Sequence, residues 1–284
     1  MHPDTTDIAL RRCVFAVSVL RDIDLIPGRD GVELSGTPAI QVSWDELRRA
    51  AAGVDPESTD GHDNVARWLQ QRRWVAGRHR SELREAARPV GLPAGHALHP
   101  GDDWPRERVL GDALDLGLGF VGADPAQPEA VVILPPALLV AAAVDVTWCW
   151  QDARRYLDRM ATLAMQRWTR APGQVLRPMG DCDVVTLLGS AAFRAALCTE
   201  SGGMRAMVVP MRTRGWADLS HIDPAFAIAA AAASSPADRG FERGLLVTPD
   251  EVVLALAGGR PHEVALRGSA VDLPQHLRPV LYHR

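Results

Sequence analysis

The chain contains no lysine, and all 31 of its basic residues are arginine. This absence excludes enzymes with a Schiff-base lysine, nucleotide-binding proteins with a phosphate-loop lysine, and protein kinases. Asparagine is almost absent as well, because it occurs only at Asn64. Three large classes of protein are therefore excluded before any motif is considered.

Cysteine is scarce, and the four cysteines, Cys13, Cys149, Cys182 and Cys198, form no CxxC pair. Their spacing argues against a zinc ribbon and against a thioredoxin-like redox site. The GxSxG sequence of a nucleophile elbow is missing too, so no catalytic triad is predicted. We expect buried free thiols and neither a metal nor a cofactor.

Hydrophobic runs long enough to cross a membrane are also missing. The most apolar stretch, residues 131–144, contains two prolines and is shorter than the roughly 20 residues that a membrane-spanning helix needs. The first residues show no basic region followed by an apolar stretch and a cleavage site, as a secretory signal would. We therefore expect a soluble cytoplasmic protein without membrane insertion.

The composition that is present is that of a folded protein. The chain has 284 residues, of which 47% are hydrophobic and 23% charged, enough for one large domain or two modest ones. A formal net charge of −4 gives no general attraction to nucleic acid or to anionic lipid. The charge balance therefore argues against a nucleic-acid partner.

The first ninety residues are predicted to be mainly helical. Apolar spacing predicts helices over 5–21 and 63–78, with a short hairpin over 31–43 between them. Ser43 followed three residues later by Glu46 is the spacing of a capping box, which begins a further helix.

The second half is predicted to mix helices and strands. Its expected elements are a strand at 130–134, a helix at 135–170 broken near 146–150, a helix at 183–198, a strand at 204–211, a helix at 224–233, and a meander with arms at 245–248, 252–256 and 262–266. Before it, residues 89–128 are dense in proline and glycine, which favours a long connection with a short helical possibility over 105–116.

Together these elements predict an α+β fold. We expect a helical N-terminal subdomain with a short hairpin over 1–90, a connection over 91–129, and a C-terminal subdomain over 130–284 in which helices pack on a small, largely antiparallel sheet. One continuous domain is the alternative.

Two short motifs resemble functional signatures only in part. Gly117, Gly119 and Gly122 spell GxGxxG, but prolines follow at once, so no helix begins at the third glycine to meet a pyrophosphate. A glycine-rich turn is the expected structure. His96 and His99, near two aspartates, have the residue types of a metal site, although histidines beside a turn are the simpler interpretation.

Two loops carry the side chains best suited to a site, because both lie next to predicted helix N-termini and combine arginines with acids and a histidine. The candidate ligand-binding residues are Arg177, Asp181, Asp183, Arg212, Arg214, His221 and Asp223. The structural alternative is that the aspartates cap helices and the charges pair with one another.

A third feature is a run of arginines from Arg67 to Arg84, on and after one predicted helix. Such a face could contact phosphates of DNA, and an ion-paired, solvated helix is the alternative.

The leading interpretation is a non-catalytic binding protein for a protein partner or a small anionic ligand, because the usual catalytic signatures are missing. The first alternative is a small-molecule enzyme with a pocket built from loops 177–183 and 210–223. The second is a DNA-binding regulator that uses the face from Arg67 to Arg84.

Overall fold

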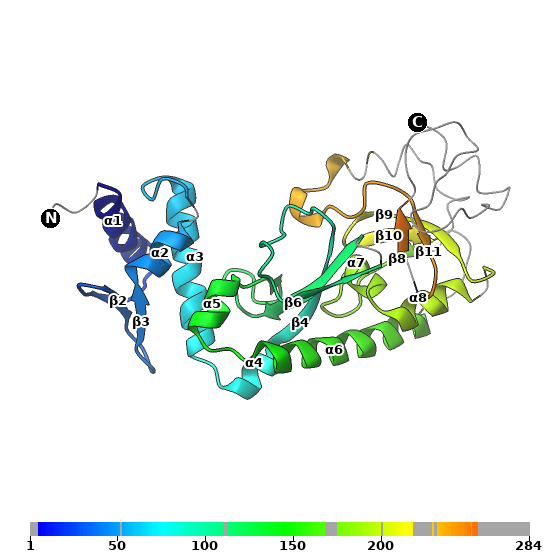
Figure 1. Cartoon of the computed structure of the whole chain (residues 1–284), viewed down its shortest axis with the longest axis horizontal. Helices are drawn as coiled ribbons and strands as arrows, with labels where there is room; N and C mark the ends of the chain where they lie inside the picture. Colours follow the sequence, from blue (N-terminus) through cyan, green and yellow to red (C-terminus); the bar gives the residue numbers. More distant parts are fainter. Residues whose placement is uncertain are drawn as a thin grey trace. The chain divides into compact units, whose positions relative to one another are not determined.

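A computed structural model of the chain describes residues 5–51, 53–110, 113–167, 175–199, 201–217, 229, 232–250 and 252–254 (Figure 1). Helices and small antiparallel sheets are both present, so the predicted α+β class is confirmed. The chain forms two compact units: unit 1 comprises residues 1–86 and 120–145, and unit 2 comprises residues 87–119 and 146–284. The sequence-based domain boundaries, which are continuous in sequence, stay a prediction.

Unit 1 combines helices with a three-stranded antiparallel sheet, in the order β1-β2-β3. Its elements are α1 (Thr5–Leu20), β1 (Leu25–Pro27), β2 (Gly31–Leu34), β3 (Ile40–Ser43), α2 (Trp44–Ala50), α3 (Thr59–Ala76), α4 (Arg80–Ala86), β7 (Val131–Val132) and α5 (Pro136–Ala141). The predicted hairpin is present as β2 and β3. The predicted capping box is present too, because the Glu46 N–H donates to Ser43 Oγ at 3.2 Å while the Ser43 N–H donates to Glu46 Oε2 at 2.9 Å.

The core of unit 1 forms because the apolar faces of its helices meet the sheet. Helix α1 packs on α3, and α2 packs on both α3 and the hairpin. Fully buried side chains from each of these elements fill the space, among them Val14, Val32, Leu47 and Leu69. Trp74 adds an edge contact to Phe120, with ring centroids 6.0 Å apart.

Unit 2 contains most of the strands. Its elements are β4 (Ala87–Pro93), β5 (Arg106–Val109), β6 (Leu114–Val121, whose last two residues belong to unit 1), α6 (Val146–Arg167), β8 (Val175–Leu176), α7 (Val184–Leu188), α8 (Ala191–Cys198), β9 (Arg205–Met211), β10 (Arg214–Ala217), the 3₁₀ turn η2 (Pro236–Asp238), β11 (Leu245–Val247) and β12 (Val252–Leu254).

Two sheets organise unit 2. One has the order β12-β11-β9-β10-β8, with every neighbouring pair antiparallel, and the other has the order β4-β6-β5. The last two residues of β6, Phe120 and Val121, pair with β7 within unit 1. Helix α6 packs along β4, while α7 also packs on β4 (Figure 1). The core between these elements is rich in leucine and valine and includes Leu116, Leu187, Met207 and Val209.

Several predicted elements are confirmed. The strand at 204–211 is β9, and the hairpin around Pro249 and Asp250 is β11 with β12. The four cysteines are buried free thiols, as expected. Most of the helix predicted at 224–233 and all of the third arm at 262–266 lie outside the described residues.

Three predictions were wrong. The segment 105–116 contains strand β5 and the start of β6 instead of a helix, and the helix predicted over 183–198 is interrupted by Gly189 and Ser190, where Ser190 caps α8. The GxGxxG sequence is mostly strand, because its first two glycines lie inside β6 and only Gly122, with a φ of 79°, lies in a turn. A Cβ atom on Gly117 would lie only 2.3 Å from the Trp104 ring, so this glycine makes room for the indole.

Among the described residues, none of the helices combines the length and apolarity required to cross a membrane.

Candidate functional site

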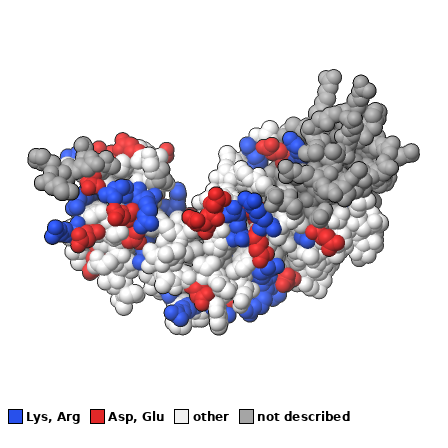
Figure 2. Space-filling view, viewed as in Figure 1, with Lys and Arg blue, Asp and Glu red and all other residues white. Residues whose placement is uncertain are grey.

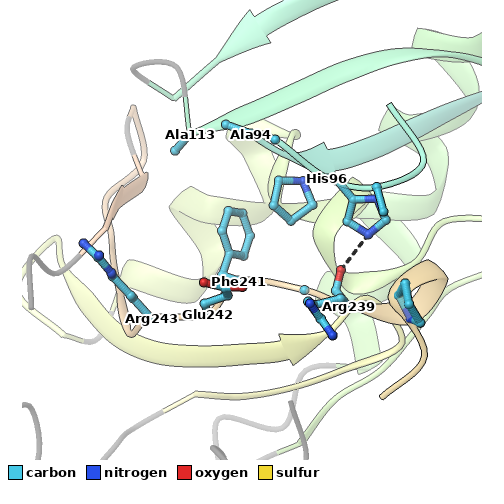
Figure 3. A pocket seen from close by; sticks show the side chains of 12 residues that line it. Ala94, His96, Ala113, Arg239, Phe241, Glu242 and Arg243 are labelled. Atoms are coloured by element: carbon cyan, nitrogen blue, oxygen red, sulfur yellow. Dashed lines mark hydrogen bonds between the residues drawn. The ribbon is translucent and has the colours of Figure 1, made fainter. Parts of the chain in front are cut away.

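Unit 2 contains a cavity of about 340 Å³ between two segments that lie far apart in the sequence. One wall is the end of β4 and the turn after it, from Pro93 to Ala97, together with Ala113. The other wall is the segment from Arg239 to Arg243, which follows η2. In Figure 3, Phe241 lies between Arg243 on one side and His96 and Arg239 on the other, with Glu242 next to it.

His96 joins the two walls. The Leu98 N–H donates to His96 Nδ1 at 3.1 Å, so Nδ1 carries a lone pair and Nε2 carries the proton. Nε2 then donates to the Arg239 carbonyl at 2.9 Å. Both ring nitrogens of the neutral imidazole are therefore occupied, which fixes the ring's tautomer and orientation.

The surroundings of His96 favour the neutral ring. The side chain is buried, with 8% of its surface exposed. This burial lowers the pKa of His96 below its usual value, and the nearby charge of Arg212 lowers it further, against opposing contributions from the Arg239 carbonyl and Asp183. At ordinary pH the imidazole is thus neutral, and its hydrogen bonds connect the turn after β4 to the segment at Arg239.

The charge at the cavity comes from the segment 239–243. Arg239 is half-buried, whereas Glu242 and Arg243 are exposed, and among the described residues none of these three side chains makes an ion pair or a side-chain hydrogen bond. Phe241 is buried, with 4% of its surface exposed, and supplies an apolar surface. The cavity therefore combines two guanidinium groups, one carboxylate and one aromatic ring.

Behind this wall, the two loops singled out by the sequence meet at one ion pair. Arg212 Nη2 lies 2.6 Å from Asp183 Oδ2, and the Val184 N–H donates to the Arg212 carbonyl at 2.8 Å. Asp183 also caps α7, because its Oδ1 accepts from the Thr186 N–H at 2.7 Å. Arg212 Nη1 donates to the Ala237 carbonyl at 3.3 Å, which ties the pair to η2 next to the cavity.

Asp181 takes part in a separate cluster. Its Oδ2 accepts from Arg88 Nε at 2.5 Å and from the Tyr156 hydroxyl at 3.0 Å. The Arg88 guanidinium also lies over the Tyr156 ring, 4.2 Å from its centroid. Burial raises the pKa of Tyr156, so the phenol stays protonated and donates to the carboxylate.

The remaining candidates do not join either group in the described part of the chain. Arg177 and Arg214 are exposed, and the antiparallel register of Leu176 with Gly215 places both arginines at the same end of the β8–β10 pairing. His221 and Asp223 lie outside the described residues. The structure thus brings Asp183 and Arg212 together, whereas Asp181 is held in a different cluster.

Sequence reasoning missed the segment that lines the cavity. In the sequence, His96 is only half of a loose metal-binding pair, and Arg239 and Arg243 have no recognisable spacing. Within the described residues, no group of three or more histidine, cysteine, aspartate or glutamate side chains is arranged to hold a metal ion. His99 Nε2 instead lies 3.5 Å from Asp115 Oδ2, and the His99 ring packs edge-on against the Trp104 ring.

Comparison with protein families, with curated proteins and with solved structures finds no match for this chain.

Proposed function

We propose that this chain is a binding protein for a small ligand that carries an anionic group, and that the cavity of unit 2 holds it. One observation carries the proposal: Arg239 and Arg243 line a cavity of about 340 Å³, and neither has a carboxylate partner among the described residues. Guanidinium groups bind carboxylates and phosphates through paired N–H donors. A cavity of this size suits a small metabolite.

The chemistry of the walls supports binding over catalysis. His96 uses both ring nitrogens in hydrogen bonds, so its neutral form has no free lone pair with which to accept a substrate proton. Asp183 and Arg212 neutralise each other at 2.6 Å. What the cavity offers a ligand is two donors of charge-assisted hydrogen bonds and the apolar surface of Phe241.

The orientation of the ligand follows from the same residues. The anionic group would bind a guanidinium group at the edge of the cavity, and an apolar part would contact Phe241, which lies between Arg239 and Arg243 (Figure 3). Glu242 stands between the arginines in sequence and would repel a ligand with negative charge spread over its whole surface. The cavity therefore fits a small carboxylate or phosphate ester with one apolar end.

The test begins with native mass spectrometry of protein purified without added ligand, which shows whether a small molecule is retained. Isothermal titration with benzoate and with phenyl phosphate, at constant ionic strength, then measures affinity for the two anionic groups. Arg239→Ala is expected to weaken binding about tenfold or more. Arg167→Ala is the matched control, because Arg167 is exposed at the end of α6 and does not line the cavity.

Two results would contradict the proposal. One is the absence of any retained molecule together with no heat of binding for either probe. The other is an equal loss of affinity in Arg239→Ala and Arg167→Ala, which would mean that the probes respond to overall charge and not to the cavity.

The other functions expected from the sequence stay predictions. A pocket built from loops 177–183 and 210–223 would need His221 and Asp223, which lie outside the described residues. A DNA-binding face would need a surface of one sign, and Figure 2 shows arginines and acids interspersed on the side in view. A protein partner has no observation that favours it over a small ligand.

A further inference from the structure

Unit 1 contains a second cavity, of about 530 Å³, whose walls come from three places in its sequence. They are the residues just after α1, the turn between β2 and β3, and the last turns of α3 with the two residues that follow it. Pro125 closes a further side. None of these residues belongs to the cavity described above.

The lining of this cavity is rich in arginine. Three arginines, Arg21, Arg73 and Arg78, line the cavity together with one carboxylate, that of Asp22. Arg21 is already neutralised, because its Nη2 lies 2.9 Å from Asp63 Oδ1. Arg73 and Arg78 have no carboxylate partner among the described residues. The cavity therefore holds two cationic side chains whose charge is not balanced by an adjacent ion pair.

Arg78 is held in position by an aromatic ring. Its guanidinium carbon lies 4.2 Å from the centroid of the Trp74 ring. Trp74 is itself fixed, since only 8% of its surface is exposed and its ring packs edge-on against Phe120. A guanidinium held over an aromatic ring loses little further freedom when its N–H groups bind an oxyanion, so the entropic cost of binding is small.

The end of α3 would oppose an anion if its carbonyl groups were free, because a helix C-terminus carries partial negative charge. Here the Gly77 N–H donates to the Arg73 carbonyl at 3.0 Å, and the Arg78 N–H donates to the Val75 carbonyl at 3.3 Å. These carbonyls already have partners inside the fold. The Arg73 and Arg78 side chains bring positive charge to this end of the helix.

The position of Arg72, which precedes Arg73 on α3, favours a cavity over an extended basic face. Arg72 turns away from solvent, donates to the Ala141 carbonyl at 3.1 Å and lies 4.0 Å from Glu46. Of the arginines in the last turns of α3, only Arg73 is left on that helix to line the cavity, with Arg78 just beyond. Phosphates along a duplex need a row of cations, whereas one multivalent anion needs two that converge.

We infer that the cavity of unit 1 is a second ligand site, for a small molecule that carries a multivalent oxyanion group, either a phosphate ester or a polycarboxylate. Arg73 and the stacked Arg78 bind the anion, while the Trp74 ring holds Arg78. This site is independent of the one proposed in unit 2, because the two share no residue.

The experiment uses the full chain labelled with ¹⁵N at its 8 tryptophans, with the Trp74 indole signal assigned from Trp74→Phe. Pyrophosphate and citrate are titrated separately at constant ionic strength, which distinguishes the two sources of oxyanion. Saturable movement of the Trp74 signal, without movement of the Trp104 signal from unit 2, is the expected result. Arg73→Ala and Arg78→Ala are each expected to raise the dissociation constant about tenfold or more.

Arg67→Ala is the matched control, because Arg67 is exposed on the same helix but does not line the cavity. It is expected to leave the dissociation constant unchanged. An unmoved Trp74 signal with both probes would overturn the inference. So would an equal loss in Arg67→Ala and Arg73→Ala together with tighter binding of a short DNA duplex, since a basic face for nucleic acid would then account for the binding. Arg239→Ala tests the unit 2 site and should not alter the Trp74 response.

Discussion

Thr186 shows how a single hydroxyl connects two elements of unit 2. Its side chain is 1% exposed, and its Oγ1 accepts from the Gly91 N–H at 2.8 Å, which ties α7 to β4. A Cβ atom on Gly91 would lie 2.7 Å from the Thr186 Cα, so the two backbones approach too closely for a side chain between them. The turn that forms one wall of the unit 2 cavity follows directly after β4.

Replacing this hydroxyl tests its contribution to stability. Thr186→Val keeps the shape of the side chain but leaves the buried Gly91 N–H without an acceptor. We expect the free energy of unfolding to fall by about 1–3 kcal/mol, measured by urea denaturation. Thr162→Val is the control, because the exposed Thr162 hydroxyl only donates to the Asp158 carbonyl within α6, and its effect should stay within about 0.5 kcal/mol. Equal effects would show that the Gly91 contact contributes nothing particular.

The lowered pKa of His96 predicts how the stability of unit 2 depends on pH. Its pKa is lowered in the folded protein by burial and by Arg212, so the unfolded chain binds the proton more tightly. The stability from the neutral ring is complete above the unfolded pKa of about 6.5 and declines as the pH falls from there toward the lowered pKa of the folded state. Protonation would also break the Leu98 hydrogen bond and place a cation beside Arg212 and Arg239.

The measurement is the urea midpoint of the wild type and of His96→Gln between pH 5 and 8. The difference in stability between the two proteins is expected to be largest above pH 6.5 and to shrink on acidification. A difference that stays constant, or grows toward acid pH, would contradict the assignment of a neutral, doubly bonded ring.

Strand β6 shows at the scale of one element how packing overrides a sequence motif. The first two of the three glycines that resemble a nucleotide-binding loop are part of a buried strand, where Gly117 leaves room for the Trp104 ring. Trp104 Nε1 donates to the Leu118 carbonyl at 2.9 Å, so the indole lies across the strand and is held there. A strand that carries such a ring needs a residue without a Cβ atom beneath it.

Gly117→Ala should therefore destabilise the protein by about 1–3 kcal/mol through overpacking, as measured by thermal or urea unfolding. In a Trp104→Leu background the same substitution should cost much less, because the added methyl group would no longer meet the indole. The double-mutant cycle separates this steric coupling from any change in strand propensity. Additive effects would show that the close approach is not what requires glycine.

At the scale of the whole molecule, the chain enters unit 2 twice and returns to unit 1 once. Residues 120–145 complete unit 1, because Phe120 contacts Trp74, Leu138 and Leu139 are buried on α5, and Arg72 donates to the Ala141 carbonyl. Residues 1–86 alone would leave apolar side chains that these contacts cover, such as Trp74, open to water.

A fragment of residues 1–86 is therefore expected to unfold without a cooperative transition. A fragment in which residues 1–86 and 120–145 are joined by a flexible linker should unfold cooperatively, because it contains the whole core of unit 1. Circular dichroism during urea unfolding measures both. Cooperative unfolding of the shorter fragment would instead favour the continuous boundary near residue 90 that the sequence predicts.

Local chemistry allowed the sequence to predict several features on its own. The capping box at Ser43, the hairpin over 31–43, the Asp183 helix cap, strand β9 and the α+β class all depend on residues close together in the chain. The absence of lysine likewise needs no structure to exclude three kinds of protein chemistry. Such features are fixed by hydrogen bonds and propensities that operate over a few residues.

Only the tertiary structure decided where the sites lie. It places Asp183 against Arg212 but Asp181 against Arg88, although the two aspartates are separated by one residue. It brings the turn at His96 to the segment at Arg239, 143 residues further along the chain. No local pattern encodes such meetings, because they arise when buried surfaces from distant segments pack together and leave charged side chains around the cavities that remain.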